Sequence, residues 1–131
     1  MVRPLWAGAA YFGLVFGLGF ALGVVRVLIT APRLGEIRAV LLEAPVIPTA
    51  SWLVSRWCVA AFRVAPGAAE RMTMGFAAFS LTMLAELGLA VLLFGRTIAE
   101  HLATYTHAAG LIGLVAQLLF ALIPYVQGAR R

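Results

Sequence analysis

The sequence predicts an all-α integral membrane protein, an antiparallel four-helix transmembrane bundle with up-down topology. Of its 131 residues, 63% are hydrophobic and 11% are charged, whereas a soluble domain is about 45–50% apolar and about 25% charged. A chain with so few charges cannot cover its own surface with polar side chains in water. In addition, four apolar stretches approach or exceed the length of about 20 residues that a helix needs to cross a bilayer.

The four predicted spans lie at 5–29, 40–62, 73–94 and 109–126, and together they make one transmembrane domain over 1–131. The first stretch is about twice as long as the 7–15-residue apolar core of a signal peptide and lacks a clear cleavage site before Arg33, so we expect it to be retained. The connections TAPRLGEIR, RVAPGAAERM and GRTIAEHLATYTH are short. Such short connections predict that neighbouring helices are antiparallel.

The arginines predict the orientation of the bundle, because positive side chains concentrate on the cytoplasmic side of a membrane. With the N-terminus inside, the cytoplasmic side receives six arginines: Arg3, Arg56, Arg63, Arg71, Arg130 and Arg131. The opposite side receives four: Arg26, Arg33, Arg38 and Arg96. This bias favours an arrangement with both termini inside.

Antiparallel spans place the polar residues of this chain in one half of the bilayer. At about 1.5 Å per residue, Glu86 and Gln117 lie roughly 12 Å from the outer ends of their spans. Arg26 and Glu43 lie about one turn from the same side. We therefore predict one polar cluster and candidate binding site in the outer half, formed by Arg26, Arg33, Glu36, Arg38, Glu43, Glu86 and Gln117.

Glu86 is the most informative residue of this predicted cluster. A carboxyl group in an apolar span is costly, so it should face the bundle and be either paired or protonated. Arg26 is the expected partner, followed by Arg33 and Arg38. Three interpretations stay open: a structural Glu–Arg pair, a proton, ion or headgroup site, and an interface with another membrane protein.

Small residues predict where the helices pack closely. Gly13-x3-Gly17 and Gly19-x3-Gly23 match the small-xxx-small pattern. Two further stripes of small and polar residues run along the third and fourth spans: Gly75, Ala78, Thr82 and Glu86, and Gly110, Gly113, Gln117, Ala121 and Pro124. We expect packing within the chain at Gly13, Gly17, Gly19, Gly23, Gly75 and Gly113, with a homodimer seam as the alternative for the first span.

The segment GEIRAVLLEAPVIP begins the second span with charges and two prolines. Pro45 and Pro48 lack N–H donors, so the carbonyls of Leu41 and Ala44 lose their helical partners. Two geometries are open: an interfacial turn that kinks into the span, or a new helix with Pro45 in the favoured first position. Either geometry would direct the carboxylates of this segment toward the polar cluster.

Several classes of function lack their sequence signals. There is no glycine-rich phosphate loop, G-x-S-x-G or H-E-x-x-H motif, so a membrane enzyme is the third hypothesis. His101 and His107 are six residues apart and face different sides of a helix, so we expect a solvated interfacial helix there and no metal site. The single Cys58 excludes an internal disulfide. No cofactor is expected, and the scattered arginines argue against binding nucleic acid.

Two segments, 19–45 and 83–103, carry a resemblance to known proteins. Gly23-x-x-Arg26, Pro32-Arg33-x-Gly35-Glu36, Glu43-x-Pro45 and Ala85-Glu86 resemble the pattern of small, uncharacterised four-helix bacterial inner-membrane proteins. This resemblance implies a bacterial inner, or cytoplasmic, membrane as the location, and it supplies no activity.

The leading functional hypothesis is a small multi-pass structural or interaction protein, or an accessory subunit. Its expected partners are the lipid bilayer, a second copy of the chain or a larger membrane complex. The alternative is a small transporter or lipid-headgroup-binding protein. In that case Glu86 would be the protonatable or cation-binding group, and Arg26, Arg33 or Arg38 would attract anionic headgroups.

Overall fold

The computed structural model describes residues 2–43 and 45–129, without the side chains of Glu36, Val40 and Ala109. These residues are almost entirely helical and include no strand. Four helical segments within them are long and apolar enough to cross a membrane: Val2–Leu34, Ile37–Phe62, Ala68–Leu92 and Gly110–Ala129. The predicted all-helical fold with four candidate spans is therefore confirmed.

The first helical segment is longer than predicted and changes its winding near its end. It consists of α1 (Val2–Val25), a π-helical turn η1 (Arg26–Thr30) and α2 (Ala31–Leu34). Pro32 cannot donate to the carbonyl four residues earlier, and its ring crowds that carbonyl. The wider turn, in which the Ala31 N–H donates to the Arg26 carbonyl, adapts the backbone to the proline. The segment ends at Gly35, whose φ of +88° favours glycine.

The proline-rich segment starts a new helix. α3 (Glu36–Glu43) ends before Pro45, and α4 (Val46–Phe62) begins directly after it. Pro45 is the N-cap of α4. The second predicted geometry had Pro45 as the first residue of the helix, one position further in. Its carbonyl accepts hydrogen bonds from the Thr49 N–H at 3.4 Å and from Thr49 Oγ1 at 2.7 Å. Pro48 lies in the first turn of α4, where a missing N–H costs no intrahelical bond.

The second half of the chain contains two long helices and a short connecting element. α5 (Ala68–Leu92) begins five residues before the predicted span, and α7 (Ala108–Ala129) ends three residues after it. Between them lie α6 (Ile98–Ala103) and the 3-10 turn η2 (Thr104–Thr106). Thr97 caps α6 by accepting a hydrogen bond from the Glu100 N–H at 3.1 Å. The expected helix in this connection is thus present.

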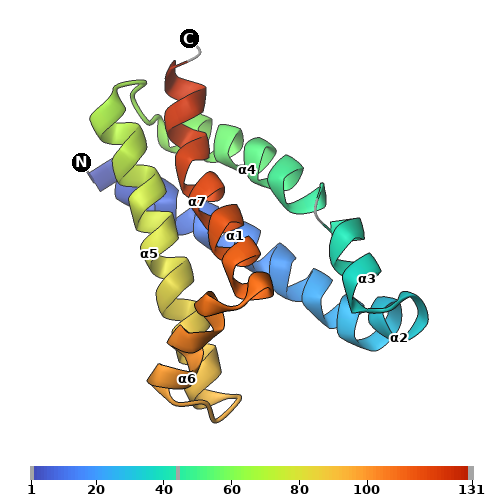
Figure 1. The fold of residues 1–131 in the computed structure, drawn as a ribbon. Helices are drawn as coiled ribbons and strands as arrows, with labels where there is room; N and C mark the ends of the chain where they lie inside the picture. The colour runs from blue at the N-terminus through green and yellow to red at the C-terminus, as the bar shows by residue number, and fades with distance from the viewer. Residues whose placement is uncertain (1, 44, 130–131) are drawn as a thin grey trace.

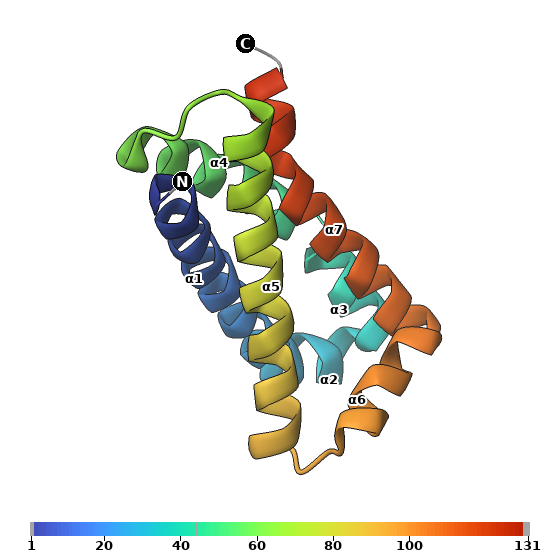
Figure 2. The same cartoon turned by 90° about the vertical axis from the view of Figure 1, so that its left-hand side faces the viewer.

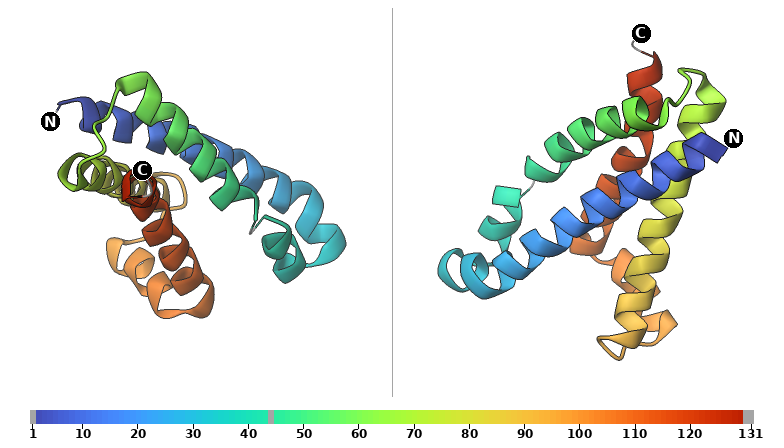
Figure 3. Two further views of the ribbon diagram at one scale, coloured as in Figure 1. Left: turned by 90° about the horizontal axis from the view of Figure 1, so that it is seen from above. Right: turned by 180° about the vertical axis from the view of Figure 1, so that it is seen from behind.

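The four long helices cross near one end and diverge toward the other (Figure 1). The two termini and the α4–α5 connection lie at the crossing end, and α6 lies at the opposite end (Figure 2). α4 runs beside α1, as the view from behind in Figure 3 shows, and α7 packs on α5. Because α1 also contacts α5, the α1–α4 pair and the α5–α7 pair are joined at the crossing. Away from the crossing the two pairs separate, so that η1 and α3 lie apart from α6 (Figure 1).

Two glycines allow the close approach of the helices at the crossing. A Cβ at Gly8 would lie 2.6 Å from the Met74 carbonyl oxygen, and a Cβ at Gly75 would overlap the carbonyl oxygen of Ala121. Gly75 confirms the packing prediction, whereas the sequence patterns missed Gly8. Gly13, Gly17 and Gly113 have nothing within 4 Å of an added Cβ, so the prediction of packing within the chain is wrong for these three.

The core at the crossing contains an arginine that the sequence placed at the membrane edge. Arg71 is 2% exposed. Its Nε donates to the Ala65 carbonyl and its Nη1 to the Pro124 carbonyl, both at 3.1 Å. The first bond ties the start of α5 to the α4–α5 connection, and the second ties it to α7. The early start of α5 buries Arg71, because it extends the helix into the space beside α7.

Candidate functional site: a pocket between the diverging helices

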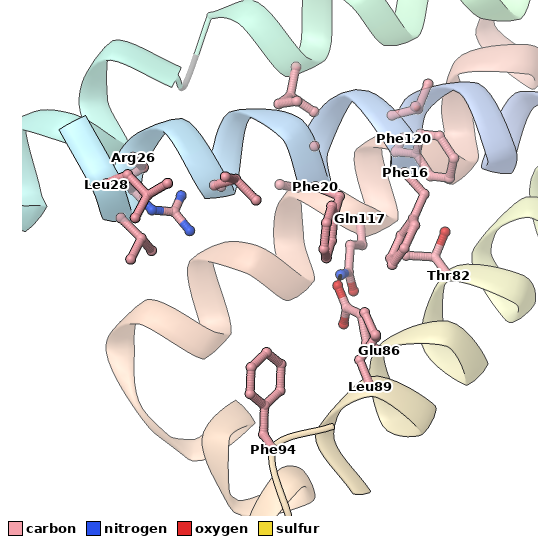
Figure 4. A pocket seen from close by; sticks show the side chains of 17 residues that line it. Phe16, Phe20, Arg26, Leu28, Thr82, Glu86, Leu89, Phe94, Gln117 and Phe120 are labelled. Atoms are coloured by element: carbon pink, nitrogen blue, oxygen red, sulfur yellow. Dashed lines mark hydrogen bonds between the residues drawn. The ribbon is translucent and has the colours of Figure 1, made fainter. Parts of the chain in front are cut away.

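A pocket of about 650 Å³ lies where α1 separates from α5 and α7. Its wall is largely apolar and includes four aromatic side chains, Phe16, Phe20, Phe94 and Phe120. The polar side chains on the wall are Arg26, Thr82, Glu86 and Gln117. Figure 4 shows the aromatic and polar side chains directed into the same space. The pocket thus combines apolar walls with a few polar groups, as ligand sites commonly do.

Two glycines of α1 keep the pocket open. Gly19 and Gly23 both line it, and a Cβ at Gly19 would reach only Ile47 Cδ1, at 4.0 Å. The nearest atom to a Cβ at Gly23 would be Arg26 Nη2, at 3.8 Å. These two positions were predicted to bring helices into close contact. They instead provide space, because α1 has already turned away from α5 and α7 at this level.

Glu86 connects α5 to α7 and to the turn after α6. Gln117 Nε2 donates a hydrogen bond to Glu86 Oε1. The Tyr105 hydroxyl donates to Glu86 Oε2 at 3.2 Å, and it lies 3.2 Å from His101 Nε2. Glu86 is therefore directed toward the bundle and held by polar partners, as a carboxyl group in an apolar helix requires.

Tyr105 lies in η2, outside the long apolar helices, and the pKa of its phenol is raised. Burial raises its pKa to about 12, and the negative charge of Glu86 and the hydrogen bond to that carboxylate act in the same direction. The hydroxyl consequently stays protonated across the neutral range. The sequence analysis missed this residue as a partner of Glu86, because the contact depends on how η2 packs against α7.

The expected pairing of Glu86 with Arg26 is wrong. Arg26 Nη1 donates to Glu43 Oε2 at 2.6 Å, which forms a salt bridge. After Gly35 the chain turns back, so the end of α3 lies close to η1. Glu43 therefore reaches Arg26 from a neighbouring segment, whereas Glu86 belongs to the helix pair that has diverged.

The predicted polar cluster accordingly divides into two groups. One is the salt bridge of Arg26 and Glu43, and the other is Glu86 with Gln117 and Tyr105. Arg33 and Arg38 are exposed on α2 and α3 and do not line the pocket. The side chain of Glu36 lies outside the described part of the chain. The inward stripe from Gly75 to Glu86 is confirmed, since Ala78 is fully buried and Thr82 is 8% exposed.

Among the residues that the structure describes, no three His, Cys, Asp or Glu side chains lie close enough together to hold a metal ion. Comparisons of the chain with protein-family models, curated proteins and solved structures gave no match. The resemblance to small bacterial inner-membrane proteins therefore stays a prediction. The functional argument depends on the pocket and its residues.

Proposed function

We propose that this chain is a multi-pass protein of the bacterial inner membrane that binds an amphiphilic molecule in the pocket between its diverging helices. In this proposal the four long helices are antiparallel spans, and both termini face the cytoplasm. The observation that carries the proposal is the pocket itself. It is an apolar space with Thr82, Glu86 and Gln117 on one part of its wall and Arg26 farther along (Figure 4).

The size and the lining of the pocket support an amphiphile as the occupant. A volume of about 650 Å³ falls within the range of about 300–1,000 Å³ that is typical of small-molecule sites. Its apolar wall favours hydrocarbon over water, because water in an apolar cavity finds few hydrogen-bond partners. Its polar residues would orient a head group. A ligand with one polar end and a hydrocarbon chain matches both parts of the wall.

A structural or accessory role is the second candidate. The Arg26–Glu43 salt bridge holds η1 against α3, and the Glu86–Gln117 hydrogen bond holds α5 against α7. A protein that only organises a membrane complex, or associates with a second copy of itself, needs such connections and no selective ligand. Under this function, bilayer lipid would occupy the pocket without any preference.

Photo-cross-linking separates the two candidates. The purified protein in nanodiscs is exposed to hexadecanol that carries a diazirine on its chain, and labelled residues are identified by mass spectrometry. We expect labels on the pocket residues Phe20, Leu89 and Phe94. Gly19→Leu narrows the pocket and should reduce this labelling. Gly13→Leu makes the same change on α1 where nothing lies nearby, and it should have no effect.

Two results would refute ligand binding in the pocket. One is labelling spread evenly over all lipid-facing side chains, and the other is equal labelling of the pocket in both leucine variants. Either result would leave the structural role as the better explanation. Replacing glycine by leucine inside a helix raises helix propensity, so both variants are expected to keep the fold.

A further inference from the structure

We propose that the pocket selects amphiphiles whose head group is a primary amine, held by Glu86, Gln117 and Thr82. This inference rests on the proposed function, because it names the head group of the ligand in the same pocket. It changes the expected chemistry of the ligand from an anionic headgroup at the arginines to a cationic one at the carboxyl group.

Three hydrogen-bond acceptors lie together on one part of the wall. Gln117 Oε1 is buried and has no hydrogen-bond partner. Glu86 offers its carboxylate oxygens. Thr82, one helical turn from Glu86, also lines the pocket, and its hydroxyl donates to the Ala78 carbonyl at 2.8 Å, which leaves its oxygen able to accept a further hydrogen bond. Figure 4 shows these side chains near one another, with Arg26 farther along the wall.

An ammonium group complements this arrangement of acceptors. It carries three N–H donors and no acceptor, so it can bond to Glu86 and Thr82 and, once the Gln117 amide turns toward the ligand, to the unpaired Gln117 oxygen. A hydroxyl head supplies only one donor, and an ether supplies none. A buried acceptor without a donor is unfavourable. The carboxyl group of Glu86 on the apolar wall, with an unsatisfied acceptor beside it, therefore points to a donor-rich head group.

The charges on the wall favour a cation as well. Arg26 is engaged by Glu43, so these two charges largely cancel. Among the residues that the structure describes, no cationic side chain forms a salt bridge with Glu86. A carboxylate without a countercharge is unfavourable in an apolar environment, and a ligand ammonium would supply that charge. A phosphate head would instead meet the carboxylate of Glu86.

Competition against the hexadecanol probe tests the head group at constant chain length. The competitors are hexadecylamine, hexadecanol, hexadecyl methyl ether and hexadecyl phosphate, in nanodiscs of zwitterionic lipid. We expect hexadecylamine to halve the labelling of pocket residues at about a tenfold lower concentration than the ether, as one net hydrogen bond to a charged group implies. Hexadecanol should fall between them, and the phosphate should compete worst.

Variants assign the preference to particular atoms. Glu86→Gln should remove most of the advantage of the amine over the alcohol, whereas Gln117→Leu should weaken both relative to the ether. Glu100→Gln makes the same chemical change as Glu86→Gln on an exposed carboxyl group outside the pocket. It should leave the order of competitors unchanged.

The outcomes separate this inference from the proposed function. If the amine competes no better than the ether, or the phosphate competes best, the amine preference is overturned while binding in the pocket stands. If Glu86→Gln keeps the full advantage of the amine, the assignment to Glu86 is overturned. If the probe does not label the pocket, or labels it equally in Gly19→Leu, the proposed function fails first. The competition on the unmodified protein is decisive even where a variant does not fold.

Discussion

Replacing Tyr11 by phenylalanine should destabilise the crossing of α1 and α7 through one hydrogen bond. Tyr11 is fully buried, and its hydroxyl donates to the Phe120 carbonyl at 2.7 Å. In a regular helix that carbonyl would accept from the N–H of residue 124, but Pro124 has none. The hydroxyl of Tyr11 thus takes the place of the missing backbone donor. Tyr11→Phe removes only this oxygen, because the phenyl ring can keep its stacking on Phe120 at a centroid distance of 4.2 Å.

The expected cost of Tyr11→Phe is about 1.5 kcal/mol of unfolding free energy. Leaving a buried acceptor unsatisfied costs about 1–3 kcal/mol. Hydrogen bonds between helices in membranes contribute less, on average about 0.6 and at most about 1.7 kcal/mol, because the unfolded chain in the membrane also finds partners. The Phe120 carbonyl has lost its helical donor, so we expect a value near the upper end of the membrane range.

The assay is reversible unfolding of the purified protein in mixed micelles with increasing SDS, followed by circular dichroism. A second background, Pro124→Ala, restores an N–H that can donate to the Phe120 carbonyl. Tyr11→Phe should cost about 1 kcal/mol less in that background, since neighbouring positions that share a partner are coupled. Tyr125→Phe is the matched control, because this tyrosine is 40% exposed. An equal cost of Tyr11→Phe in both backgrounds would refute the reasoning.

Three further predictions follow from the packing, the titration and the charges. Gly75→Ala forces a methyl group into a backbone carbonyl and should cost about 1–3 kcal/mol of stability in the same assay, whereas Gly113→Ala, with open space around it, should cost almost nothing. The contribution of Tyr105 to stability should be complete below its unfolded pKa of about 10 and should decrease as the pH rises toward its folded pKa of about 12. The reason is that the unfolded chain binds fewer protons than the folded chain in this range. In unfolding measured from pH 9 upward, a Tyr105→Phe variant should lack this decrease. Glu43→Gln leaves the pocket arginine without its countercharge and should make hexadecyl phosphate compete several-fold better than in the unmodified protein.

Clear results would contradict each of these three predictions. Equal stability of the two alanine variants would show that the helices at Gly75 can separate at no cost. Identical pH profiles of the unmodified protein and Tyr105→Phe would show that folding does not raise the pKa of Tyr105. Unchanged competition by hexadecyl phosphate in Glu43→Gln would show that Arg26 does not determine the charge preference of the pocket.

Much of the candidate site could be predicted from the sequence because it depends on depth along a helix. Glu86 and Gln117 occur at similar distances from the ends of neighbouring apolar stretches, and they are hydrogen-bonded partners in the structure. The inward direction of Thr82 and Ala78 follows from their spacing on the same helical face. Both inferences use only the rise of a helix and its periodicity.

Other parts of the site could not be predicted from spacing alone. Arg26 was assigned to Glu86, but it pairs with Glu43 because the chain turns back at Gly35. The glycines of α1 show the same limit. Gly8 lies at the crossing, whereas Gly13 has nothing within 4 Å of an added Cβ and Gly19 faces the pocket. The same residue type has three different roles, and the crossing of the helices decides which one applies.

The sequence by itself determined that the chain is helical, that it contains four stretches able to span a membrane, and which polar residues share a depth. These properties depend on composition and on the regular geometry of a helix, which are local. Only the tertiary structure decided where α1 separates from α5 and α7, which carboxylate Arg26 reaches and that Arg71 is buried. These features depend on crossing angles and rotations of whole helices, which result from the sum of many small packing contacts between distant residues.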